Sequence, residues 1–384
     1  MKRRRRLLVL CPHPEHVAPG QRLKYEQYFD HFRANGIDVV VSPFMSLRMW
    51  NIVYAKGRLA EKVLWTLWGY LRRVFDLLRL RSFDGAYVFL WVTPFGPPLF
   101  ESLACRLARS VVYDIDDLVF LAPPSRANRL IAPLKGRKKM EYLMRHAQQV
   151  IVCTPALEEV ARRHNASVTD ISSTINTDTY RPTGRYEGGR RLTIGWSGSH
   201  STSKYLTLLE PVFAKLRIEH EFDVLVIGDP SFRFEREACE AIPWREATEV
   251  ADLQRIDIGV YPLPDEPWVY GKSGLKALQY MALGIPTVAT AIGANFRVIE
   301  DGVSGFLVRT EEEWVDRLRL LLTDAGTRAR VGAGARERVE RLYSVRANRD
   351  RYLSIVQRAI GAGDGRSPVG ASEAARAAST GSLS

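Results

Sequence analysis

Two lysines stand at the start of an amphipathic stretch, residues 271–293, GKSGLKALQYMALGIPTVATAIG. Lys272 and Ser273 lie in a glycine loop, and Lys276 and Gln279 follow Lys272 on one helical stripe, at i+4 and i+7. The start of a helix presents free N–H groups and the positive end of its dipole, which together favour anions. Two ammonium groups there are suited to offset a diphosphate. The alternative interpretation is a solvated lysine stripe.

The Gly-Lys-Ser sequence at 271–273 is not a Walker A loop. That motif requires a glycine five positions before Gly271, where Glu266 stands, and no predicted strand leads directly into the loop. The stretch is better described as a loop and a helix with an apolar face at Leu275, Leu278 and Met281, ended by Gly284 at the C′ position.

Composition bounds the class of protein. A chain of 384 residues with 46% hydrophobic residues is long enough for two packed cores. Its four cysteines form no Cys-x-x-Cys pair, which is typical of core thiols in a reducing compartment and predicts no disulfide and no metal site. No apolar run approaches 18 residues, so we expect no membrane span, and the basic leader Arg3–Arg6 precedes a first strand too short for a signal peptide.

The net charge of +12 suits an anionic partner. The excess is partly local, since residues 123–140 carry six Lys and Arg and no acid. A nucleotide, a nucleic acid and an anionic lipid surface are all compatible with it, as is a solvated basic face. No helix-turn-helix or RRM module is recognisable, so we expect no nucleic-acid partner.

Short apolar runs alternate with helical patterns over most of the chain, which predicts parallel sheets with crossover helices. Predicted strands lie at 7–11, 38–42, 85–90, 111–114, 150–153, 192–196, 223–227, 258–261 and 287–290. Predicted helices lie near 20–35, 58–80, 97–109, 136–147, 202–217, 248–254, 275–282, 311–323, 326–342 and 344–360.

The fold class is therefore α/β, with two Rossmann-like doubly wound domains facing across a cleft. We expect a first domain at 1–178, a linker at 179–191, a second domain at 192–343, a final helix at 344–361 that packs back on the first domain, and a disordered tail at 362–384. Ligands of such sheets bind beyond the carboxyl ends of the strands, so every motif should follow a strand.

Residues 257–308 resemble the nucleotide-sugar signature of group 1 (family four) glycosyltransferases, through Met-Ala-x-Gly-x-Pro and the later Gly-x-x-Gly-Phe-Leu-Val. Further segments are similar along the chain: Val17-Ala-Pro-Gly-Gln-Arg22, Asn35-Gly-Ile-Asp-Val39, Asn176-Thr-Asp-Thr-Tyr-Arg-Pro182, Ile194-Gly-Trp-Ser-Gly198 and Val226-Ile-Gly-Asp229. The resemblance implies the GT-B fold, a donor held mainly by the second domain, retention of anomeric configuration and no required metal or other cofactor. A branch with Gly-Lys-Ser and Gln-Tyr-Met-Ala resembles bacterial polysaccharide-type transferases.

The chain departs from the family pattern at two glutamates spaced eight residues apart, which fall on Gly271 and Gln279. The resemblance implies that Gln279 orients the nucleotide ribose through its carbonyl oxygen. Nothing replaces the first carboxylate unless Asp265 or Glu266 reaches into the site.

The family also has a basic pair early in the second domain. Lys204 fits its lysine, but Trp196–His200 contains no arginine. We expect the backbone N–H groups of Gly198 and Ser199 and the charge of Lys272 to compensate, with Gly228 close to the diphosphate.

Asp116 and Asp117 end the predicted strand at 111–114. One interpretation is an Asp-rich turn, and another is the metal-binding Asp-x-Asp of single-domain glycosyltransferases, against which the two-domain pattern speaks. The resemblance places Asp116 where the family has a His near the donor sugar, so both carboxylates would face the sugar and stabilise positive charge. Gly20, Arg22 and Tyr25 would face the donor phosphate or the acceptor, unless they are ordinary first-turn surface.

Residues 57–80, GRLAEKVLWTLWGYLRRVFDLLRL, have polar residues at a 3.6 period. The pattern fits a core-packed helix or a basic amphipathic helix on anionic lipid. The resemblance favours lipid, because many such transferases act on lipid-linked acceptors at the inner face of a membrane, and Arg3–Arg6 would add attraction there.

The sequence thus predicts a cytoplasmic glycosyltransferase, associated with the inner face of the cell membrane, that moves a sugar from a UDP- or GDP-type donor to an acceptor hydroxyl in polysaccharide or glycolipid biosynthesis. Three alternatives remain: a non-catalytic GT-B partner protein, suggested by the missing glutamates, a nucleotide-sugar epimerase of the same fold, and a nucleic-acid binder, suggested only by the charge. Acceptor-independent conversion of the donor would indicate the epimerase, and donor turnover would exclude the partner protein.

Overall fold

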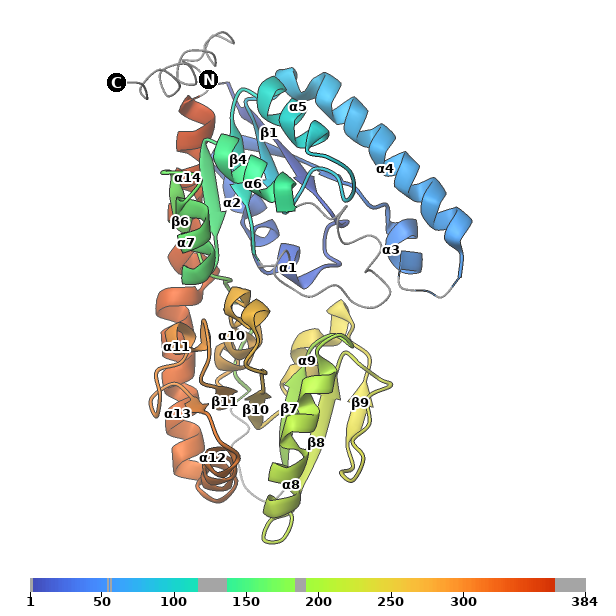
Figure 1. The fold of residues 1–384 in the computed structure, drawn as a ribbon. Coiled ribbons are helices and arrows are strands. Elements are labelled where there is room, and N and C mark those ends of the chain that lie inside the picture. The colour runs from blue at the N-terminus through green and yellow to red at the C-terminus, as the bar shows by residue number, and fades with distance from the viewer. Residues whose placement is uncertain (1–2, 54, 56, 117–136, 184–190, 363–384) are drawn as a thin grey trace, which may run out of the picture.

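The computed structural model describes residues 3–53, 55, 57–116, 137–183 and 191–362. These residues form two α/β units, drawn one above the other in Figure 1. Asp117, most of the basic run at 123–140, most of the expected linker and the tail beyond 362 lie outside the described residues. Each unit is built on one six-stranded sheet, and every paired strand in both sheets is parallel.

The first sheet has the order β2-β1-β3-β4-β5-β6. Its strands are β1 (Arg5–Cys11), β2 (Ile37–Pro43), β3 (Gly85–Phe89), β4 (Val111–Asp114), β5 (Gln149–Val152) and β6 (Val168–Asp170). The helices around it are α1 (Pro19–Arg22), α2 (Phe29–Ala34), α3 (Leu47–Val53), α4 (Leu59–Arg79), α5 (Leu99–Leu107), α6 (Arg137–His146) and α7 (Pro155–Arg162).

The second sheet has the order β12-β11-β10-β7-β8-β9. Its strands are β7 (Leu192–Ser197), β8 (Phe222–Ile227), β9 (Glu240–Ile242), β10 (Ile258–Tyr261), β11 (Thr287–Thr290) and β12 (Phe306–Val308). Its helices are α8 (Glu210–Leu216), α9 (Glu249–Leu253), α10 (Leu275–Ala282), α11 (Asn295–Val298), α12 (Glu311–Thr323) and α13 (Ala325–Arg338).

The central strands are buried on both faces, because helices cover both sides of each sheet. In β1, every residue from Leu7 to Cys11 is fully buried, and its register with β2 pairs Leu7 with Val39. One core of the first unit lies on each side of its sheet, and the second unit has the same arrangement. The sheets therefore hold the loops at their carboxyl ends in fixed positions.

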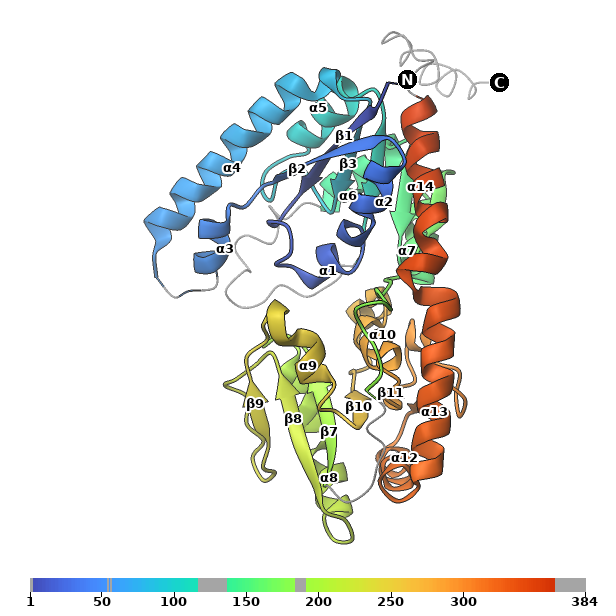
Figure 2. The same cartoon turned by 180° about the vertical axis from the view of Figure 1, so that it is seen from behind.

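The last helix, α14 (Val345–Ala362), returns to the first unit after α13 has packed on the second (Figure 2). Tyr352 stacks on Tyr28 with ring centroids 4.6 Å apart, and its hydroxyl donates a hydrogen bond of 2.9 Å to Asp114. Ile360 packs against Gly85 of β3. The chain thus crosses between the units twice, which limits how they move apart.

Two sequence-based interpretations of helices differ from the structure. The expected helix at 20–35 is broken into α1, a 3-10 turn at Glu26–Tyr28 and α2. The break lies where Lys24 and Tyr25 both turn into the core. The helix at 57–80 forms as α4, but its buried residues are Gly69, Arg73, Asp76 and Leu77, so the core-packed interpretation of its apolar face is wrong.

Candidate functional site

The side chain of Lys276 lies between two aromatic rings at the carboxyl ends of β7 and β10. Its Nζ is 5.3 Å from the ring centroid of Trp196 and 5.2 Å from that of Tyr261, both of which are buried. α10 places the lysine there because Leu278, Met281 and Ala282 anchor the helix in the core. The ammonium is therefore held against the electron-rich faces of two rings instead of beside a carboxylate.

Burial, and then the nearby charge of Lys272, lower the pKa of Lys276 from 10.5 to about 7. Both causes act against the charged form of the amine. An anion that arrives at this amine would reverse both effects, because it supplies the missing opposite charge. The geometry therefore favours a negatively charged ligand.

Lys272, which is close enough to affect Lys276, and Lys204 each contact one ring of an aromatic pair. Lys272 Nζ lies 5.5 Å from the ring centroid of Trp268, and Lys204 Nζ lies 5.0 Å from that of Tyr205. The two rings are themselves 5.6 Å apart. The structure thus brings together two lysines from segments almost seventy residues apart, and Lys204 remains exposed.

Glycines leave room for these side chains. A Cβ on Gly198 would lie 2.5 Å from the Trp196 ring and 2.6 Å from Lys276 Cε. A Cβ on Gly228 would lie 2.0 Å from the Gly198 carbonyl, and Gly228 has φ of +110°, which other residues rarely adopt. Both glycines therefore allow the carboxyl ends of β7 and β8 to approach each other below Lys276.

One expectation for Gly198 needs correction. Its backbone N–H donates a hydrogen bond of 2.9 Å to the carbonyl of Ile227, so the β7–β8 ladder already uses this donor. Ser199 is exposed at the start of the following turn, where its carbonyl accepts hydrogen bonds from Thr202 and Ser203. Of the two expected backbone donors, only Ser199 remains a candidate.

In the first unit, Gly20 and Asp116 lie close together. A Cβ on Gly20 would lie 2.7 Å from Asp116 Oδ2, so the glycine permits this carboxylate to lie against α1. Below them, the buried ammonium of Lys24 pairs with Asp114. Burial is the largest single influence and lowers the pKa of Lys24, but Asp114, Cys153 and Asp116 together outweigh it and raise that pKa above its usual value. This pair fixes the end of β4 that carries Asp116.

Tyr25 lies in the core, and Arg22 lies between the two units. Tyr25 is fully buried among Phe29, Tyr87 and Phe89, so it is a core residue and does not face a ligand. Arg22 crosses to the second unit, where its guanidinium pairs with Glu249 at 2.5 Å.

Glu249 is a residue that the sequence did not single out. It is 3% exposed, and it accepts hydrogen bonds from four side chains: Arg22 at 2.5 Å, Tyr180 at 2.9 Å, Trp244 at 3.0 Å and Gln279 at 3.0 Å. Its partners are between 5 and 227 residues away, so no local pattern reveals it. Gln279 is buried and its amide also donates to Tyr180.

Other contacts join the two units near α10. Ser273 Oγ lies 2.7 Å from Ser173 Oγ, so this predicted ligand of the donor forms a contact between the units. Arg297 of α11 pairs with Asp170 and donates to the Cys153 carbonyl at 2.6 Å. Asp265 and Glu266 accept hydrogen bonds from Tyr270 and Trp268 in their own loop.

In the described part of the chain, no three His, Cys, Asp or Glu side chains gather where they would hold a metal ion. Nor is any of the described helices long and apolar enough to cross a membrane.

Part of the second unit is similar to a known family of enzymes. Residues 191–324 match the model of glycosyl transferases group 1. D-inositol 3-phosphate glycosyltransferase of Stackebrandtia nassauensis is 27% identical over 215 residues, which cover 48% of this chain and 47% of that relative. The match thus spans about half of the relative's length. Trehalose synthase of Pyrococcus horikoshii is 35% identical over 83 residues, 22% of this chain and 20% of that protein.

Solved structures match nearly the whole chain at low identity. Sucrose-phosphate synthase of Thermosynechococcus elongatus has a TM-score of 0.67 and 16% identity, covering 94% of this chain and 100% of that one. Anabaena HepE, solved in complex with UDP-glucose, has a TM-score of 0.63 and 14% identity, covering 92% and 99%. The two-sheet GT-B fold expected from the sequence is therefore confirmed.

Proposed function

We propose that the chain, which through residues 191–324 belongs to the group 1 glycosyltransferases and as a whole has the GT-B fold, transfers a sugar from a nucleoside diphosphate sugar to an acceptor hydroxyl. The observation that carries this proposal is the half-buried ammonium of Lys276, set between two aromatic rings next to Lys272. Two like charges held together at the start of a helix are suited to bind an anion.

In this proposal the lysines act on the leaving group. As the bond to the sugar breaks, negative charge grows on the diphosphate, and Lys276, Lys272 and Lys204 stabilise it without a metal ion. The residues are held in place before the substrate arrives, so little reorganisation is needed. Asp116, on the opposite unit, would meet the sugar and stabilise the positive charge that develops there.

The donor is of the UDP or GDP type, and Gln279 contacts its ribose. HepE, which shares the fold, was solved with UDP-glucose, and this supports a uridine nucleotide as the first to be tested. We propose further that the anomeric configuration is retained. The acceptor is a lipid-linked glycan reached from the cytoplasmic face of the membrane, in polysaccharide or glycolipid biosynthesis. D-inositol 3-phosphate, named in a relative, is the soluble acceptor to compare with it.

Calorimetry with UDP-glucose and GDP-glucose tests the donor site. We expect micromolar binding of one donor to the wild-type chain and its loss in Lys272→Ala and Lys276→Met. Lys215→Met is the matched control, because Lys215 is exposed and pairs with Glu311 on the surface of the second unit. Failure of both donors to bind, or equal binding by all variants, would contradict the proposal.

Turnover separates the proposed function from its alternatives. Release of nucleoside diphosphate only in the presence of an acceptor would support a transferase. Conversion of the donor without any acceptor would indicate an epimerase. Donor binding without turnover, for every acceptor offered, would favour a non-catalytic partner protein. The anomeric configuration of the product, read by nuclear magnetic resonance, decides retention.

A further inference from the structure

The helix α4 turns its apolar side outward. Nine of its large apolar side chains are between 42% and 75% exposed, among them Leu64, Leu67, Trp68, Leu71, Phe75 and Leu78. With residues set 100° apart, these nine side chains span one arc of about 180°. Exposed apolar residues are common singly, but a continuous face of this size in a soluble chain marks a contact surface.

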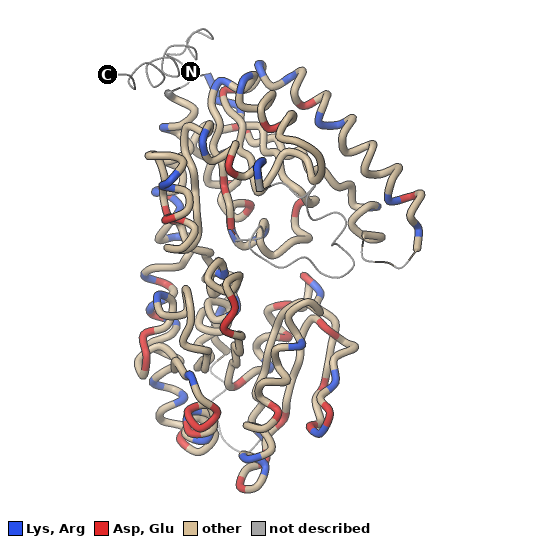
Figure 3. The backbone as a smooth tube through the Cα atoms, viewed as in Figure 1, with Lys and Arg blue, Asp and Glu red and all other residues tan. Residues whose placement is uncertain are grey.

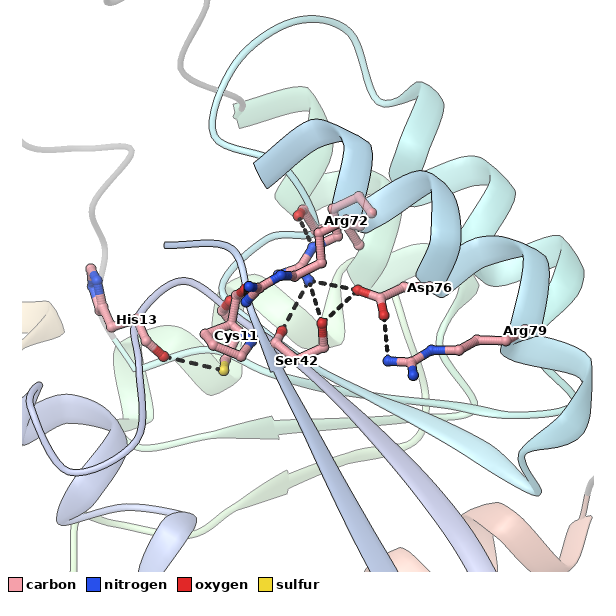
Figure 4. Close-up of polar contacts among 9 residues, drawn as sticks. Cys11, His13, Ser42, Arg72, Asp76 and Arg79 are labelled. Carbon is pink, nitrogen blue, oxygen red and sulfur yellow. Dashed lines mark hydrogen bonds and ion pairs between the residues drawn. The ribbon is translucent and has the colours of Figure 1, made fainter. Parts of the chain in front are cut away.

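A buried polar network fixes this orientation (Figure 4). Arg73 points from the opposite side of α4 into the first unit, where it is fully buried. Its guanidinium donates to the carbonyls of Cys11, Ser42 and Val92 at 2.8 to 2.9 Å and pairs with Asp76. Rotating the helix to bury its apolar side would remove these hydrogen bonds from a buried charge, which is strongly unfavourable.

The borders of the apolar face are basic. Around it lie Arg48, Arg58, Lys62, Arg72, Arg79 and Arg81, while the acids are Glu61, next to Arg58, and Asp76, which is buried. Figure 3 shows Lys and Arg at both ends of the helix. The leader adds to this charge at one end, because Arg6 and Arg79 lie 4.6 and 5.9 Å from the ring centroid of Phe83.

A groove continues the face toward the edge strand β2. It has a volume of about 660 Å³ and lies between Val41 and the side chains of Leu71, Phe75 and Leu78. The guanidinium groups of Arg72 and Arg79 stand at its border, held by the Pro43 carbonyl and by Asp76. Apolar walls with cations at the rim are suited to an amphiphile with an anionic head.

We infer that the outward face of α4 docks on an anionic lipid bilayer, with its apolar side chains among the acyl chains and its arginines at the phosphates. A helix of this kind lies in the interface, 5 to 10 Å deep, and needs no spanning segment. Basic residues near the surface add attraction to anionic lipids. The inference deepens the proposed function, since it rests on a lipid-linked acceptor there, but the binding itself requires no donor.

A second copy of the chain fits this face less well. α4 is roughly 30 Å long and 10 Å wide, so its outward side offers about 300 Å². A standard protein interface buries about 800 Å² per partner. The positive charge beside the apolar face would also meet the same charge on the copy. A bilayer can bind a single amphipathic helix, so the small area is sufficient, and anionic lipids supply the negative charge.

Flotation with vesicles tests the inference on the full chain. We expect it to float with phosphatidylcholine vesicles that contain phosphatidylglycerol, and less with phosphatidylcholine alone or at high salt. Leu71→Glu with Phe75→Glu should weaken partitioning by about 100-fold, because two buried apolar side chains are lost. Ile218→Glu, at an exposed apolar residue of the second unit, should not change flotation.

Two further measurements keep the result unambiguous. The double variant should retain its melting temperature and its donor binding, so that lost flotation is not lost folding and is separate from the donor site. Fluorescence of Trp68 should be quenched by brominated lipid in the wild-type chain, and the quenching should fall in Trp68→Phe. Unchanged flotation of the double variant would overturn the inference. So would a wild-type dimer that dissociates in the double variant while neither form binds vesicles.

Discussion

Donor binding should depend on pH through Lys276. Its pKa is lowered to about 7 in the free protein, first by burial and then by Lys272. A bound diphosphate supplies the opposite charge and restores the ammonium, so binding takes up a proton above that pH. A nucleotide sugar suits the test because its diphosphate has no terminal phosphate that titrates near pH 6.

The magnitude follows from the fraction of Lys276 that is already protonated. Between about pH 6 and about pH 8.5 that fraction falls by about thirtyfold for a pKa near 7, and the affinity should fall with it. Calorimetry in buffers of different ionisation enthalpy should report uptake of up to about one proton at the upper end of this range. Below pH 6 the affinity should level off.

The unfolding free energy should also depend on pH through Lys276, but it should rise with pH where the donor affinity falls. The unfolded chain keeps the usual pKa of 10.5 and binds more protons than the folded one between about pH 7 and 10.5, so unfolding free energy rises with pH there. Lys276→Met removes that slope and should raise the unfolding free energy at neutral pH by about 1–3 kcal/mol. This is less than the lowering of the pKa would give on its own, because the amine keeps some contact with water. Donor binding should fall in the same variant.

Two results would refute this reasoning. The first is an affinity that stays flat between pH 6 and pH 8.5. The second is a pH dependence that persists unchanged in Lys276→Met, which would place the titrating group elsewhere. Lys215→Met, at an exposed lysine, should keep both the affinity and its slope.

Three substitutions test the supports of the site. Gly198→Ala should weaken donor binding by at least about tenfold, measured by calorimetry, because its Cβ meets the lysine and the ring above it; normal binding would contradict this. Asp114→Asn should lower unfolding free energy in urea by about 3–5 kcal/mol, since Lys24 is left buried without its counterion. Glu249→Gln should lower the free energy by about 3 kcal/mol through Arg22; no change in either variant would mean that the pair is dispensable.

Much of the fold could be predicted because its signals are local. The helix predicted near 311–323 forms as α12 over those residues, and in the structure Thr310 and Glu313 form a capping box at its start. The strands β4, β10 and β11 were equally well placed by their apolar runs. The strands β6, β9 and β12 were missed, because three residues are too few to show a period.

The direction in which α4 faces could not be read from its pattern. An amphipathic pattern shows that a helix has an apolar side, but not whether that side is buried. In α4 the decision is made by Arg73, whose partners are carbonyl groups of β1, β2 and the loop after β3. Backbone carbonyls carry no sequence signal, so the outward face appears only in three dimensions.

Some residues of the site could likewise be predicted from local sequence, and others could not. Lys272 and Lys276 belong to one short motif, and local spacing brought them together in the sequence as in the structure. Ser273 belongs to the same motif, but its partner Ser173 is 100 residues away, and the contact between the units could not be foreseen. Gly20 and Asp116 are likewise brought together only by the sheet that holds β1 and β4.

The glutamine at 279, where the family that this segment resembles has a glutamate, follows from its neighbour. Gln279 donates to Glu249 over 3.0 Å, and a glutamate at 279 would place two carboxylates at that distance in a buried site. One of them would have to take a proton. In this chain the negative charge is on Glu249, which also pairs with Arg22 and so joins the second unit to the first.

Exchanging the side chains of Gln279 and Glu249 tests whether the two residues depend on each other. Gln279→Glu alone should lower unfolding free energy by about 2–4 kcal/mol at neutral pH, with the loss diminishing in acid as one carboxyl takes up a proton. Adding Glu249→Gln should recover part of that stability, because the hydrogen bond between the two side chains re-forms in the opposite direction. Recovery cannot be complete, since Arg22 then lacks its carboxylate. A double variant no more stable than Gln279→Glu would show that the two residues act independently.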